Sequence, residues 1–256
     1  MKQRILSGII LSFFSLLISS CGLDTFYFLN APRAIVHSVT YENSDPLINY
    51  LSFNTYENQS HLPSDFSFDG TLIYYRIYTN TNSIASFDAE INSVNNSSNY
   101  NTAVEKLISK KYQPLYYLYG GTKKQFAIDR NNFSLGSVKN IEIRLSDYNG
   151  INSVSPEASY LDHISVNGTV VGTPLREHGS KNSFNFGWCN YAGNTETCKC
   201  PASGDDDFED GTVTDGWYYI NLYAFAYGHD TTFKTYYSNV LHLGCLKVKS
   251  PSDNNW

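Results

Sequence analysis

The alternation of apolar and polar positions predicts mostly β-strands in this chain. The clearest early strand spans 71–78, where Ile73, Tyr75 and Ile77 would point to one side and Leu72, Tyr74, Arg76 and Tyr78 to the other. Segments 34–41 and 47–56 are expected to form the first antiparallel pair, because turn-forming residues lie between them. Further strands are predicted at 115–119, 124–128, 139–148, 183–188 and 235–248.

Two short glycine-containing turns predict hairpins. Asn167-Gly168 separates the β-type segments 163–166 and 169–171, and this dipeptide suits the positive φ angles of a type I′ turn. Gly120-Gly121 is expected to form the turn after 115–119.

Segment 216–227 alternates in an unusual way, because both of its faces are apolar or aromatic. A strand of an ordinary antiparallel sandwich has one face in water. We therefore expect the second face either to be covered or to bind something. One face carries Tyr218, Ile220, Leu222, Ala224 and Ala226, and the other carries Trp217, Tyr219, Asn221, Tyr223, Phe225 and Tyr227.

Between residues 83 and 111 the apolar period changes from two to nearly four, which predicts two short helices. Ser83 could cap the first helix, and the polar run 95–99 would separate the pair. We expect a helical hairpin over 83–112 inserted into a β domain. The two apolar faces consist of Ile84, Phe87, Ile91 and Val94, and of Val104, Leu107 and Ile108.

The N-terminus has the pattern of an export signal: Lys2 and Arg4 precede an apolar run over 5–18, and Ser19-Ser20 precedes Cys21. An uncleaved anchor is the alternative, but a membrane helix needs about 20 apolar residues. Residues 17–22 resemble the lipobox of bacterial lipoproteins. That resemblance implies a signal peptide over 1–20, a lipid on Cys21, and attachment to a membrane of the bacterial cell envelope.

Composition supports a β protein and limits its partners. Aromatic residues make up 15% of the chain, with 21 Tyr and 15 Phe, which is typical of sheets. The formal net charge is −6 and no basic run occurs. Nucleic acid is therefore not expected as a partner, and attachment to a membrane would depend on acyl chains rather than on electrostatic attraction to anionic lipid.

Five cysteines include Cys21, and the other four suggest two disulfides in an exported protein. Cys198 and Cys200 are separated by one residue and would not normally pair with each other, so Cys189 and Cys245 are their expected partners, in either order. A zinc site of four thiolates is the alternative, although such sites usually present two close pairs.

Segments 70–76 and 218–240 suggest a family. The run over 218–224, followed by Gly228 and Ser238-Asn239-Val240, resembles the closing strands of fibronectin type III domains, and 70–76 resembles their third strand. With the lipobox and the helical insertion, the chain also resembles exported spirochaete-type lipoproteins of unassigned function. These resemblances imply a mainly β fold, a fibronectin type III or immunoglobulin-like antiparallel sandwich with additional strands, used for adhesion or assembly.

The expected domain organisation follows from these segments. Residues 1–20 form the signal peptide, 21–30 a lipidated lead-in, and 31–256 an elaborated sandwich domain. Within that domain 83–112 is the helical insertion, and 113–211 supplies extra strands and loops, with a separate subdomain as the alternative for this segment.

An acidic segment, 205–211, offers the carboxylates of Asp205, Asp207 and Glu209 at alternate positions, which could suit a calcium ion. It is not an EF-hand loop, because Asp210 stands where that loop requires glycine and Gly216 where it requires glutamate. A solvated acidic loop is the preferred interpretation.

The second face of 216–227 could be an aromatic platform that binds a glycan or a peptide. The preferred alternative is that the two helices lie on this face, since large exposed apolar patches are uncommon in monomers. The candidate residues of the platform are Tyr74, Arg76, Tyr78, Trp217, Tyr219, Tyr223, Phe225 and Tyr227.

Six histidines occur, but no HExxH, G-x-S-x-G or phosphate-loop motif does. We therefore expect no cofactor and no enzymatic activity. The function predicted from the sequence is a lipid-anchored binding, adhesion or assembly module of the cell envelope with a protein or glycan partner. A carbohydrate-binding or glycan-acting protein on the same scaffold is the alternative.

Overall fold

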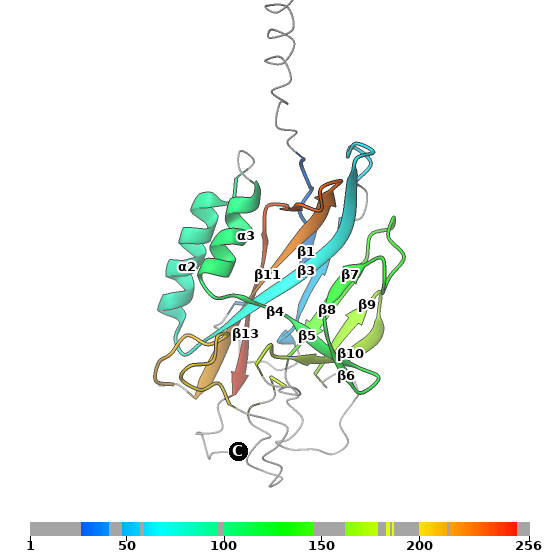
Figure 1. The fold of residues 1–256 in the computed structure, drawn as a ribbon. Helices are drawn as coiled ribbons and strands as arrows, with labels where there is room; N and C mark the ends of the chain where they lie inside the picture. Colours follow the sequence, from blue (N-terminus) through cyan, green and yellow to red (C-terminus); the bar gives the residue numbers. More distant parts are fainter. Residues whose placement is uncertain are drawn as a thin grey trace, which may run out of the picture.

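The computed structural model describes residues 27–40, 48–56, 59–96, 100–145, 162–178, 183–184, 186, 200–213 and 216–249. The predicted signal peptide, Cys21, Cys189 and Cys198 lie outside the described residues. The chain is mainly β, with two antiparallel sheets and two helices (Figure 1). Neither helix of the described part is long and apolar enough to cross a membrane.

One sheet has seven strands in the order β1-β2-β8-β9-β10-β5-β6. β1 and β2 are the antiparallel pair expected from the sequence. The turns Gly120-Gly121 and Asn167-Gly168 both have positive φ angles and join β5 to β6 and β9 to β10, as predicted. The strands are β1 (Ala34–His37), β2 (Leu51–Asn54), β5 (Tyr116–Tyr119), β6 (Thr122–Gln125), β8 (Asn140–Arg144), β9 (His163–Val166) and β10 (Thr169–Leu175).

The other sheet is built on two long strands that pair along nearly their whole length, β3 (Phe66–Tyr78) and β11 (Trp217–Asp230). β3 extends five residues further toward the N-terminus than the alternation predicts. The short strands β4 and β7 pair with the free edge of β3, and β12 and β13 with that of β11. Their bounds are β4 (Gln113–Pro114), β7 (Ala127–Asp129), β12 (Thr235–Tyr237) and β13 (Leu241–Lys249).

The main core lies between the two sheets. Ile73, Tyr75 and Ile77 of β3 enter it, as the alternation predicts, and residues of β8 and β9 meet them from the seven-stranded sheet. From β11 the core takes Tyr218, Ile220, Leu222 and Ala224.

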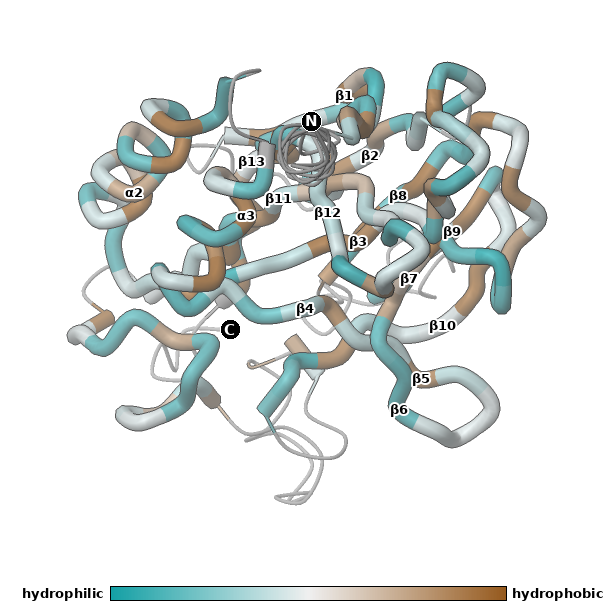
Figure 2. The backbone as a smooth tube through the Cα atoms, turned by 45° about the horizontal axis from the view of Figure 1, so that its top comes forward, coloured by the Kyte–Doolittle hydropathy of each residue, from teal (hydrophilic) through white to brown (hydrophobic). Residues whose placement is uncertain are grey.

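Helices α2 (Thr81–Val94) and α3 (Tyr100–Ser109) pack on the outer face of β3 and β11, which confirms that this face is covered. Figure 2 shows the helices on one side of these two strands and β8, β9 and β10 on the other. Asn80, not Ser83, caps α2: its side chain accepts a hydrogen bond from the Ser83 amide at 3.1 Å. Asparagine and serine serve equally well as N-caps, so the sequence did not separate the two positions.

Three strand predictions are wrong in part. The predicted strand 124–128 divides at Phe126 into the end of β6 and the start of β7, which belong to different sheets. The predicted strand 235–248 divides into β12 and β13, because Ser238 turns inward and its hydroxyl accepts a hydrogen bond from the Ala226 amide. Within 183–188 the described residues form only an isolated bridge at Ser183, although Phe184 and Phe186 are buried in the main core.

Candidate functional site

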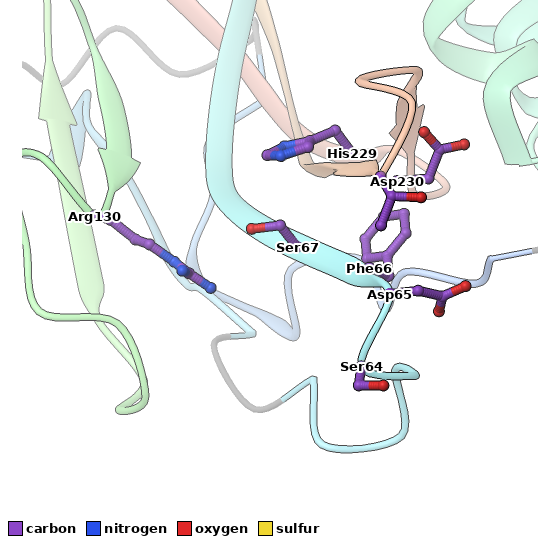
Figure 3. Close-up of a pocket in the computed structure, with 8 residues that line it drawn as sticks. Ser64, Asp65, Phe66, Ser67, Arg130, His229 and Asp230 are labelled. Carbon is purple, nitrogen blue, oxygen red and sulfur yellow. The ribbon is translucent and has the colours of Figure 1, made fainter.

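A pocket of about 350 Å³ lies where the first residues of β3 meet the last residues of β11 (Figure 3). Ser67 of β3 stands directly opposite His229 of β11, and Phe66 stands opposite Asp230. Residues opposite each other in an antiparallel pair project to the same face of the sheet. The lining residues are Ser64, Asp65, Phe66, Ser67, Arg130, His229, Asp230 and Thr231.

A β-bulge orients the histidine of this pocket. In the pairing of β3 with β11, Gly70 lies opposite Tyr227 and Phe68 opposite Gly228, so Asp69 is the extra residue. The Asp69 carboxylate reaches the imidazole of His229, with 2.6 Å between Oδ2 and Nδ1. Because an ionised carboxylate only accepts hydrogen bonds, Nδ1 carries the proton that joins this pair.

Glycine is required beside that bulge. Gly70 has φ +148°, and a Cβ atom there would lie 1.9 Å from the carbonyl oxygen of Ile128. The close approach lets β7 pair with β3, with Asp129 opposite Gly70. Arg130 follows directly, so a guanidinium group faces the pocket from the edge of β3 opposite to His229.

Both carboxylates of the lining are hydrogen-bonded to other residues of the protein. Asp65 accepts a hydrogen bond from the hydroxyl of Tyr27 at 2.8 Å, which raises the pKa of that tyrosine to about 12. Asp230 accepts from the hydroxyl and amide of Thr232, from the Lys234 amide and from the Tyr236 hydroxyl. These bonds, the Thr232 hydroxyl first, lower the pKa of Asp230.

One exposed aromatic ring lies at the rim. Phe233 stacks on the imidazole of His229, with ring centroids 5.4 Å apart and an interplanar angle of 13°. Its side chain is 81% exposed and its φ is +62°. A bulky residue with positive φ is uncommon and indicates a constrained turn.

The aromatic platform expected from the sequence is not an open surface. Tyr78, Tyr219, Tyr223 and Phe225 are buried under α2 and α3, and Tyr74, Trp217 and Tyr227 pack against the same cluster. Arg76 is buried too, and it pairs with Glu209. The physical reason is that the helices need this face for their own apolar residues, among them Ile84, Ile91, Val104 and Leu107.

A partly buried polar network lies beneath the helices. Asp88 of α2 accepts hydrogen bonds from the Tyr223 hydroxyl at 2.5 Å and from the Asn221 amide at 2.7 Å. Asn221 also donates to the Tyr112 hydroxyl, and its carbonyl lies 2.7 Å from Nε2 of His242. Burial raises the pKa of Tyr223 and lowers that of His242, the latter against the opposing charge of Asp88.

The acidic segment 205–211 is neither a solvated loop throughout nor a cation site. Asp207 is 1% exposed and forms an ion pair with Arg176, which also binds Asp205 at 2.7 Å. Glu209 is held by Arg76. Arginine therefore occupies the oxygens expected for calcium, and the part of the chain in view contains no other group of acidic, histidine or cysteine side chains placed to hold a metal ion.

Cys245 is a free thiol buried on the helix-covered face of the second sheet, and burial raises its pKa. Cys200 packs against the core between the sheets. Of the two cysteines predicted as possible partners of Cys245, Cys200 lies against a different core cluster and Cys198 is outside the described residues. The predicted disulfide to Cys245 is absent from the described structure. The pairing of Cys189, with either Cys198 or Cys200, falls outside it.

Sequence reasoning did not find this pocket. His229 and Asp69 are 160 positions apart, and neither has a local motif around it. The available signal was Asp69-Gly70 at the start of a strongly alternating segment, because glycine inside a strand often marks a bulge.

Comparisons of this chain with protein-family models, with curated proteins and with solved structures gave no match.

Proposed function

We propose that this chain is a lipid-anchored binding protein of the bacterial cell envelope, and that it holds a small polar ligand in the pocket at His229. The observation that supports this most directly is the oriented His229–Asp69 pair facing a guanidinium group across a pocket. Binding sites typically combine a concave surface with a few convergent polar groups.

The lining favours binding over catalysis. Hydrolysis of a glycoside needs one carboxyl group whose pKa is raised, so that it can donate a proton. The pKa of Asp230 is instead lowered by its hydrogen bonds. The glycan-acting alternative would therefore have to use Asp65, whose oxygen is bound to Tyr27.

The finer assignment of the fold belongs to the same proposal. A fibronectin type III-like core fits the direct pairing of β3 with β11 and of β11 with β13. In that arrangement α2 and α3 would be an insertion after the third strand of the sandwich.

Anchoring is tested by metabolic labelling with an alkyne analogue of palmitate. We expect label on the wild-type chain and none on Cys21→Ser, with the label surviving hydroxylamine because at least one acyl group would be amide-linked. An unlabelled wild-type chain would refute the anchor.

Binding is tested by applying the full chain in detergent to a glycan array. We expect His229→Asn to lose the wild-type signal, with His61→Asn, outside the pocket, as its control. A blank array for the wild type, together with no response in a screen of small polar metabolites, would refute the binding function.

A further inference from the structure

The groups in the pocket that have no protein partner are mainly hydrogen-bond donors on one side of β3. Within the described part of the chain, the guanidinium of Arg130 and the hydroxyls of Ser64 and Ser67 form no hydrogen bond or ion pair with other side chains. Figure 3 shows the His229 ring and the Ser67 hydroxyl directed toward the side on which Arg130 lies. A ligand entering there would meet these groups first.

The carboxylates of the lining do not compete for that space. Figure 3 shows Asp65 directed away from Arg130, and Asp230 lies on the same side as Asp65. Each is bound within the protein, as described above. Asp69 is bound to His229. Among the described residues that line the pocket, Arg130 is therefore the one ionic group that faces the ligand space unpaired.

A guanidinium group recognises a carboxylate through two parallel hydrogen bonds. His229 adds the complementary function: with its proton on Nδ1, the neutral ring accepts a hydrogen bond at Nε2, which a carboxylate cannot donate but a hydroxyl can. Ser67 can donate or accept between them. The lining thus suits a small molecule that carries both a carboxylate and a hydroxyl group.

We propose that this pocket binds an acidic sugar unit of the uronic acid type, with its carboxylate on Arg130 and a ring hydroxyl on Nε2 of His229. The volume of about 350 Å³ is large enough for a single sugar ring. A phosphate carries about two negative charges, whereas the pocket offers one cation and has three carboxylates nearby. A singly charged anionic group is therefore the better match. The assignment rests on the binding function proposed above.

The test measures binding of D-glucuronate to the full chain in detergent by isothermal titration calorimetry and saturation-transfer NMR. D-Glucose, which lacks the carboxylate, and acetate, which lacks the hydroxyls, are the matched ligands. We expect glucuronate to bind at least tenfold more tightly than either. Arg130→Gln should remove that preference, and His229→Asn should weaken glucuronate binding without improving acetate binding.

Arg33→Gln is the control variant, because Arg33 is also a surface arginine but lies over Tyr56, outside the pocket. Thermal melts monitored by circular dichroism check that each variant is folded.

Equal binding of glucose and glucuronate, unaffected by Arg130→Gln, would overturn the acidic-sugar assignment and leave the binding function standing. If glucuronate does not bind but another ligand on the array binds in a way that depends on His229, the acidic-sugar assignment is also overturned and the binding function still stands. Failure of every ligand on the array would overturn both.

Discussion

Arg176 and Asp207 form a fully buried, bidentate ion pair, with Nη2–Oδ1 and Nε–Oδ2 distances of 2.6 and 2.9 Å. The hydroxyl of Tyr75 also donates to Asp207, at 2.6 Å. The backbone of the acidic segment bonds to Ile77 on both sides of Phe208. The pair therefore fixes this segment against β3 from within the core.

Replacing Asp207 with Ala should lower the free energy of unfolding by about 3–5 kcal/mol, because it removes the bidentate partner of the buried Arg176 guanidinium and leaves it only the single contact with Asp205. Urea denaturation measures the change. Asp206→Ala is the matched control, since Asp206 is an exposed neighbour, and it should change stability by no more than about 0.5 kcal/mol. Similar values for the two variants would contradict the role assigned to the buried pair.

Tyr223→Ala should cost about 3–5 kcal/mol, because it removes a fully buried ring beneath α2 and α3. Tyr119→Ala, at a tyrosine that is 55% exposed, serves as the control and should be nearly neutral. The same denaturation experiment compares them. A neutral Tyr223→Ala would show that the helices do not cover this face in solution.

Stability should fall as the pH drops below the ordinary histidine pKa of 6.5, in part through His242. Its pKa is lowered in the folded state by burial, with Asp88 opposing, so the unfolded chain binds the proton more readily. The contribution of His242 is therefore complete above pH 6.5 and is lost as the pH falls through the lower, folded value.

Denaturation of wild type and His242→Gln at several values between pH 8 and pH 5 tests that contribution. The wild type should lose more stability over the range than the variant, which lacks the titrating ring. Parallel curves for the two proteins would rule His242 out as a source of the dependence.

Gly70→Ala should destabilise the protein more than Gly136→Ala. Both glycines have φ values in the region that L-residues rarely adopt, +148° and +112°, and that alone costs about 1–3 kcal/mol. Only at Gly70 would the new Cβ also meet a backbone oxygen, since Gly136 has open space around it. Thermal unfolding compares the variants, and an equal loss at both positions would refute the close approach of β7 to β3.

The sequence predicted most of β3 and β11 but not the strand ends that line the pocket, at 66–67 and 229–230. Alternation assigned the two faces of β3 and β11 correctly, because inward and outward positions in a strand depend only on the period of two. The helices were predictable for the same kind of reason, from a period near four. Ile84 and Leu107 are buried as that period requires.

The polar contacts were not predictable in the same way. Arg176 and Asp207 are 31 positions apart, and His229 and Asp69 are 160 apart. No local pattern marks such partners, because they are brought together only by the order of the strands. The start of α2 was missed for a different reason, since Asn80 and Ser83 are both good caps and the choice depends on where the preceding strand ends.

The bond from Tyr27 to Asp65 places the beginning of the described chain directly beside the pocket. Tyr27 lies six positions after Cys21, and six steps of a fully extended chain span about 20 Å. If a lipid on Cys21 is embedded in a membrane leaflet, this short connecting segment keeps the mouth of the pocket near the headgroup layer. The protein would then sample sugars displayed on neighbouring glycolipids and wall polymers close to the bilayer, and not those at the outer reaches of the envelope.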